Sequence, residues 1–126
     1  MNKFLDKNQD YFYFVFRVVV GLLFFLHGWM KLQMVLGGQI ALGSLMFFAM
    51  LIEVIGGAFI LLGLFTKYTA SISALEMIVA YFKAHAPNGV SPLANHGEPA
   101  VLFFAAFLVL ATFGARKWAI DNILKR

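Results

Sequence analysis

Four ionisable side chains, Arg17, His27, Glu53 and Glu76, lie inside apolar stretches of this 126-residue sequence. Each would cost at least about 2.5–3.5 kcal/mol in hydrocarbon unless a partner group compensates it. His27 is followed four residues later by Lys31, which places both near one face of a helix. Histidine and lysine donate hydrogen bonds, and a buried carboxyl can take up or release a proton. These residue types favour a polar pocket within an apolar protein.

The composition is typical of a membrane protein. Hydrophobic residues make up 62% of the chain and charged residues 13%, far from the values of a soluble domain. The sequence has no cysteine, which excludes disulfides and any cysteine-based or iron–sulfur site built by this chain. The formal net charge is +4, but most basic residues flank the apolar stretches, where they orient membrane spans. The expected partner is therefore a lipid bilayer and not nucleic acid.

Four apolar segments have about the 17–25 residues that a membrane-spanning helix needs, although the last two are short. The first segment contains Arg17, lacks a small-residue cleavage pattern and precedes three further spans, so we interpret it as a retained helix. The sequence predicts an all-α fold, a single-domain integral membrane four-helix bundle over residues 1–126. The predicted helices cover about residues 11–32, 42–65, 68–84 and 99–113.

The basic residues predict the orientation of the bundle. Lys31 and Lys83 fall at one end, whereas the other end would carry Lys3, Lys7, Lys67, Arg116, Lys117, Lys125 and Arg126. Because lysine and arginine concentrate on the cytoplasmic side, both the N- and C-termini are expected to be cytoplasmic. The expected location is the plasma or inner membrane, which the chain would cross several times.

The depth of each charge along its helix predicts its partner. At about 1.5 Å per residue, Arg17 and Glu76 both lie roughly 8–12 Å from the cytoplasmic edge, which predicts a buried ion pair with an architectural role. Glu53 would lie near the midplane and His27 nearer the outside, so Glu53 is expected to face His27 and Lys31. The predicted ligand pocket, with a lid from the loop before the last helix, comprises His27, Lys31, Glu53, His85, His96 and Glu98.

A metal site is not expected. The eleven-residue separation of His85 and His96 fits no compact ligand motif, and exposed loop histidines are common. Haem is not expected either, because His27 and His85 would be the only histidine pair at similar depth.

Several short motifs occur in a fixed order along the chain. They are R-x3-G at Arg17, H-G-x2-K at His27, E-x2-G-G at Glu53 with a following G-L-x-T-K, and H-x-P-N-G at His85 leading to H-G-E-x-A. Together they resemble the DoxX family of small four-helix membrane proteins, over residues 17–121. The ending G-A-R-K-W-A-I-D differs from the family pattern, since Arg116 stands where glycine is usual and Ala119 where serine is usual.

The resemblance implies a link to quinone-dependent oxidoreductase systems, including thiosulfate-to-quinone electron transfer and complexes that join a sulfurtransferase to superoxide dismutase. The cysteine-based mechanism of related enzymes cannot be carried over to a chain without cysteine. The leading hypothesis is that the pocket binds a quinone, with His27 and Lys31 donating hydrogen bonds to a carbonyl and Glu53 exchanging a proton. His27 and Glu53 are then the predicted catalytic residues, and a partner oxidoreductase subunit or soluble donor must supply electrons.

Two alternatives remain open at this point. The chain could be a non-catalytic membrane anchor or assembly subunit, with buried charges that only fix the fold. It could also be a small transporter, which would require a homo-oligomer because four helices leave little room for alternating access. The bound partner could be a small apolar molecule other than a quinone.

Overall fold

The computed structural model describes residues 2–125, which form helices and loops without a β-strand. The predicted all-α class is confirmed. Met1 and Arg126, the latter among the basic residues used to predict orientation, lie outside the described residues. The elements are α1 (Lys3–Lys7), α2 (Gln9–Leu36), α3 (Leu45–Leu62), α4 (Thr66–Ala80), the π-helical turn η1 (Tyr81–His85), the 3-10 turn η2 (Ala86–Asn88), α5 (Glu98–Phe113) and α6 (Ile120–Leu124).

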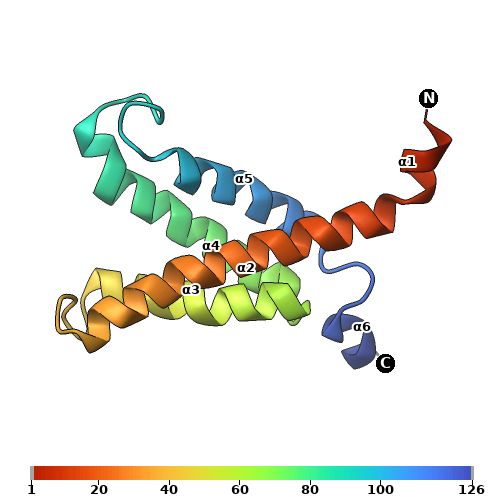
Figure 1. The fold of residues 1–126 in the computed structure, drawn as a ribbon, viewed down its shortest axis with the longest axis horizontal. Helices are drawn as coiled ribbons and strands as arrows, with labels where there is room; N and C mark the ends of the chain where they lie inside the picture. Colours follow the sequence, from red (N-terminus) through yellow and green to blue (C-terminus); the bar gives the residue numbers. More distant parts are fainter. Residues whose placement is uncertain (1, 126) are drawn as a thin grey trace.

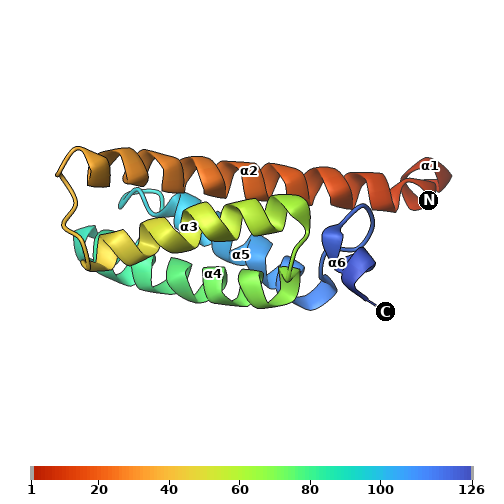
Figure 2. The same ribbon diagram turned by 90° about the horizontal axis from the view of Figure 1, so that it is seen from below.

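Four longer helices determine the shape of the molecule (Figure 1). Helix α2 packs along α3, α4 packs along α5, and further contacts join α3 to α4 and α2 to α5. Figure 1 shows that the α2–α3 pair and the α4–α5 pair diverge toward the end that holds η1 and η2, and Figure 2 shows the same helices turned by 90°. Both termini lie at the opposite end. We call these the loop end and the terminal end.

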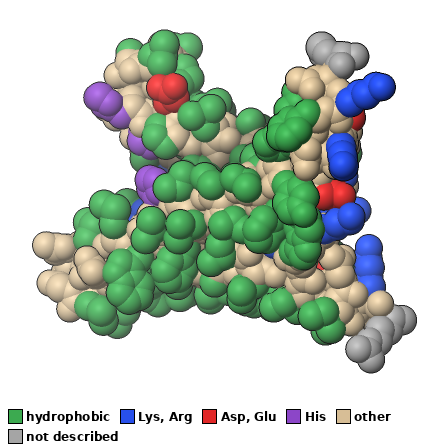
Figure 3. Space-filling model, turned by 45° about the vertical axis from the view of Figure 1, so that its right-hand side comes forward, with side chains coloured by type: hydrophobic (Ala, Val, Ile, Leu, Met, Phe, Trp, Pro, Cys, Tyr) green, Lys and Arg blue, Asp and Glu red, His purple; other side chains and the backbone are tan. Residues whose placement is uncertain are grey.

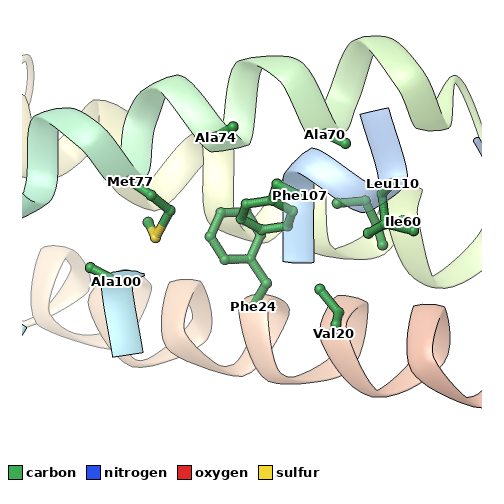
Figure 4. Close-up of a cluster of buried hydrophobic side chains, with 9 residues drawn as sticks. All are labelled: Val20, Phe24, Ile60, Ala70, Ala74, Met77, Ala100, Phe107 and Leu110. Atoms are coloured by element: carbon green, nitrogen blue, oxygen red, sulfur yellow. The ribbon is translucent and has the colours of Figure 1, made fainter. Parts of the chain in front are cut away.

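A small apolar core fills the space between the helix pairs (Figure 4). Phe24 of α2 points its ring toward Phe107 of α5, with ring centroids 4.7 Å apart in an edge-to-face arrangement. Ala70 and Ala74 on α4 are small enough to let these rings lie between the helices. The buried core residues are Val20, Phe24, Ile60, Ala70, Ala74, Met77, Ala100, Phe107 and Leu110.

The helix bounds differ from those predicted. Helix α2 is longer than predicted, with 28 residues, whereas α3 has 18. Helix α3 begins after Ser44, whose hydroxyl accepts a hydrogen bond from the Phe47 amide, and it ends at Gly63, which has a φ of +70°. These are an N-cap and a left-handed C-cap, which terminate a helix whatever the hydropathy of the next residues. Hydropathy alone therefore overestimated α3 at both ends.

The outer surface of the helices is apolar. Helices α2 and α3 are each long and apolar enough to cross a membrane, and α5 is a shorter apolar helix. Large hydrophobic side chains are exposed along the long helices, among them Leu22 and Leu26 on α2, Phe48 on α3 and Leu75 on α4. Figure 3 shows one face of this apolar surface, with most lysine and arginine side chains near the terminal end.

Glycines set the close approach of α2 and α3. A Cβ atom added at Gly28 would lie 2.6 Å from the Val54 nitrogen and 2.8 Å from the Glu53 Cβ. A Cβ at Gly21 would lie 2.5 Å from the Leu61 nitrogen, and one at Gly57 would collide with the backbone of Phe25. Helix backbones can touch in this way only where side chains are absent, as in the small-residue interfaces of membrane helices.

Replacing Gly28 with valine is therefore expected to destabilise the protein by about 1–3 kcal/mol, because the branched side chain overpacks the α2–α3 contact. Gly37→Ala is the matched control, since a Cβ at Gly37 would meet its nearest atom at 3.4 Å. Thermal unfolding of both variants in the same detergent measures the difference. Equal melting temperatures would contradict the role of Gly28.

Candidate functional site

Lys31 and Glu53 form an ion pair between α2 and α3. The Lys31 Nζ lies 2.6 Å from one carboxylate oxygen of Glu53 and 2.7 Å from the other. The Glu53 side chain is 3% exposed and the Lys31 side chain 23% exposed, so the pair extends from the interior toward the surface. Such short contacts to both oxygens are the charge-assisted kind, which are stronger than neutral hydrogen bonds.

The sequence brings this pair together through the glycine contact. Gly28 presses against the backbone of Glu53 and Val54. Lys31 follows Gly28 by three residues and lies about one turn further along the same face of α2. The lysine side chain consequently reaches the carboxylate directly.

Glu76 on α4 lies close to this pair. Gly56 of α3 packs on Ser73 of α4, because a Cβ at Gly56 would lie 3.2 Å from the Ser73 Oγ. Glu53 lies one turn from Gly56, and Glu76 lies one turn from Ser73 in the same direction, because the two helices are antiparallel. The charged groups that interact electrostatically with Glu76 are Glu53 and Lys31. Glu76 is 8% exposed, and both of its oxygens are buried without a hydrogen-bond partner. We call Lys31, Glu53 and Glu76 the charge cluster.

The predicted ion pair between Arg17 and Glu76 is not formed among the described residues. Arg17 is 1% exposed and donates to backbone carbonyls instead. Its guanidinium lies 2.7 Å from the Ala115 oxygen, 3.1 Å from the Lys117 oxygen and 2.8 Å from the Trp118 oxygen. The depth estimate failed because residues 114–121 fold back over the terminal end and supply acceptors that no span contains.

Asp121 makes a second contact from the same C-terminal segment. Its carboxylate accepts hydrogen bonds from the amides of Phe65 at 2.6 Å and Thr66 at 3.0 Å, which are the first free amides of α4. An acidic group is favourable there because it satisfies unpaired amides and opposes the helix dipole. The sequence analysis did not predict this cap. The one indication in the sequence was the position of Asp121 at the end of the G-A-R-K-W-A-I-D motif.

Arg116 has a backbone φ of +58°, in the left-handed region. Glycine adopts this conformation without steric cost, so it would suit the glycine that the family resemblance leads one to expect at this position. The Arg116 side chain lies 3.1 Å from the Asp10 carboxylate and over the ring of Tyr13. These contacts offset part of the backbone strain.

His27 faces away from Glu53 and toward α5. Its ring stands edge-on to Phe103, at 5.5 Å between centroids and an interplanar angle of 88°. His27 and Glu98 both line an open groove of about 350 Å³ between α2 and α5. We call this the α2/α5 groove; it is lined by Val20, Leu23, His27, Glu98, Pro99, Leu102, Phe103 and Ala106.

The loop between η2 and α5 is organised by Asn95, which is 2% exposed. The Asn95 amide donates to the Gly89 oxygen at 2.9 Å and its oxygen accepts from the Gly97 amide at 2.8 Å. His85 Nδ1 lies 3.2 Å from the backbone carbonyl oxygen of Asn95, whereas the side chain of His96 is exposed. His85 therefore stabilises the loop. In this arrangement it does not form the predicted lid over a ligand. Asn95 gave no signal in the sequence beyond its position among turn residues.

The predicted pocket residues thus fall into two places that share α2. Lys31 and Glu53 join Glu76 in the charge cluster, while His27 and Glu98 line the α2/α5 groove. Residues 2–125 contain no group of three His, Asp or Glu side chains suited to hold a metal ion.

Fold and site together define an all-helical protein with membrane-type helices and internally compensated charges. The chain belongs to the DoxX family, whose model matches residues 12–86. It is 38% identical to an uncharacterized protein of Haemophilus influenzae over 94% of both chains. It is 30% identical to "Putative oxidoreductase CatD" of Bacillus subtilis, over 93% of this chain and 90% of that protein. No solved structure matches the chain. As a DoxX-family member, the protein is membrane-associated.

Lys31→Met is expected to lower stability by about 1–3 kcal/mol, because the buried Glu53 side chain loses its hydrogen-bond donor. Adding Glu53→Gln should recover part of this loss, giving a coupling energy of about 0.5–3 kcal/mol in a double-mutant cycle. The exposed pair of Lys117 and Asp10 is the control, and its cycle should give less than about 1 kcal/mol. Equal coupling in the two cycles, measured by chemical unfolding in detergent, would contradict a structural role for the buried pair.

Proposed function

We propose that this protein is a quinone-interacting subunit of a membrane-associated oxidoreductase system. It would span the plasma or inner membrane several times as a four-helix bundle with both termini in the cytoplasm. The observation that carries the proposal is the α2/α5 groove, which combines a polar loop end with an apolar floor. The relative named as an oxidoreductase supports the same class of function.

The shape and lining of the groove fit a quinone. His27 and Glu98 both stand toward its loop end, since α5 begins at Glu98 and runs from there toward the terminal end. From His27 to Val20 the α2 wall extends about 10 Å and is apolar, which suits an isoprenoid tail. His27 can donate to a carbonyl of the ring.

The charge cluster supplies the ionisable groups. A bound quinone accepts electrons together with protons, so an ionisable group near the site is a requirement of that chemistry. Glu53 remains our proposed proton-exchanging residue, and Lys31 fixes the position of its carboxylate at 2.6–2.7 Å. Electrons must come from a partner subunit or a soluble donor. A Glu53→Gln variant that kept full coupled turnover would remove Glu53 from this role.

The test is the quinone content of protein purified in mild detergent, measured by mass spectrometry of the organic extract. Ala106→Trp should fill the α2/α5 groove and lower bound quinone at least tenfold, and His27→Ala should lower it further if combined. Ala105→Trp is the matched control, because Ala105 is exposed beside the groove and is not part of its lining. Equal quinone in the Ala105 and Ala106 variants, or none in the unmodified protein, would contradict the proposal.

The rival function is a non-catalytic anchor or assembly subunit. The exposed basic side chains at the terminal end, including Lys3, Lys7 and Lys67, favour it because they could bind a partner protein. Co-purification of an oxidoreductase whose activity survives neutralisation of His27, Lys31 and Glu53 would support the anchor over the quinone subunit.

The orientation can be tested with single cysteines, since the chain has none of its own. Ser91→Cys at the exposed loop end should react with an impermeant thiol reagent added outside intact cells. Lys3→Cys at the terminal end should react only after the membrane is opened. The reverse pattern would overturn the proposed topology.

A further inference from the structure

Glu76 has no assigned role in the groove, and its surroundings are unusual for a carboxylate. Both of its oxygens are buried and have no hydrogen-bond donor within reach. An ionised carboxyl in that situation would keep an uncompensated desolvation cost of several kcal/mol. The side chain must therefore either gain a partner or lose its charge.

The elements packed against α4 supply one cation near Glu76. Helix α2 contributes Lys31 and α3 contributes Glu53, and Lys31 is already held by both oxygens of Glu53. Helix α5 contributes apolar side chains, since its one ionisable residue, Glu98, is exposed at its beginning. In η1, Lys83 is exposed and His85 is bonded to the loop. The side chain of Tyr81, also in η1, donates to the Val90 oxygen and accepts from Asn95.

The total charge of the cluster decides whether Glu76 is ionised or neutral. With both glutamates ionised, one lysine would face two carboxylates, and the buried net charge would be negative. Two neighbouring carboxyls in a low-dielectric site are instead stable when they hold one proton between them. We propose that the charge cluster is electrically neutral and holds one exchangeable proton on Glu76, with Glu53 ionised against Lys31.

This assignment gives the two glutamates different parts. Glu53 is a positioned carboxylate, fixed by the lysine, and Glu76 is the neutral acid beside it. A neutral acid next to a carboxylate is the arrangement in which a proton can pass from one to the other. Lys31, whose side chain is 23% exposed, extends from the cluster to the molecular surface. The inference concerns this cluster alone and stands whether or not the groove binds a quinone.

Infrared spectroscopy of the purified protein at neutral pH tests it, because a protonated carboxyl has a carbonyl band that ionised carboxylates lack. Glu76→Gln should abolish that band, and Glu98→Gln should leave it unchanged as the exposed control. Lys31→Met should increase the band about twofold, since Glu53 then loses its cation and takes up a second proton. The band should shift when the protein is transferred to heavy water.

Conservative variants identify which carboxyl holds the proton. Glu76→Asp should move the band, whereas Glu53→Asp should leave its position unchanged, and gel filtration with thermal unfolding shows whether each variant is folded.

A band that persists in Glu76→Gln, or that moves in Glu53→Asp and not in Glu76→Asp, would overturn the assignment to Glu76. Absence of the band from the unmodified protein would overturn the neutral cluster, and a carboxylate band that responds to sodium or potassium would replace it with a cation site. A band that did not shift in heavy water would refute the exchangeable proton. The quinone content of the same preparations reports separately on the groove.

Discussion

The need to compensate every buried charge within the chain governs this structure. Arg17 and Glu53 are 1% and 2% exposed, which is tolerable only because carbonyl oxygens and a lysine lie within hydrogen-bond distance of them. The partners are specific in position, so they fix how the helices align. Lys31 and Glu53 set the register of α2 on α3 near the loop end. Arg17 and Asp121 hold the C-terminal segment against the terminal end.

Two faces of helix α2 lie in different surroundings. Residues of α2 that face α3 include Gly21, Gly28 and Lys31, of which Lys31 meets the carboxylate of Glu53. Residues of α2 that face α5 are Val20, Leu23 and His27, and they border an apolar groove. The lining of that groove does not include Lys31, Glu53 or Glu76. The proposed ligand binding and the proposed proton exchange can consequently be tested with different substitutions.

The sequence predicted the all-helical class and the presence of buried charges that need partner groups, because both depend on composition and spacing within single segments. It also placed Glu53 opposite Lys31, since glycines and charges on one face must meet a neighbouring helix. It failed for Arg17, whose partners are main-chain oxygens of Ala115, Lys117 and Trp118. Main-chain acceptors carry no residue signature, and the loop that presents them is defined only by the tertiary fold. His27 was assigned to the wrong neighbour for a related reason, because a helical face does not specify which of two adjacent helices it touches.

The C-terminal segment has a consequence for the order in which the fold is completed. Residues 115–121 follow α2 to α5 in the chain and are synthesised after them, yet they contain the acceptors for Arg17 and the cap of α4. Until they leave the ribosome, the first long helix carries a guanidinium without its acceptors, and the third long helix begins uncapped. Helices α2 to α5 therefore lack these contacts until residues 115–121 are available to complete the terminal end.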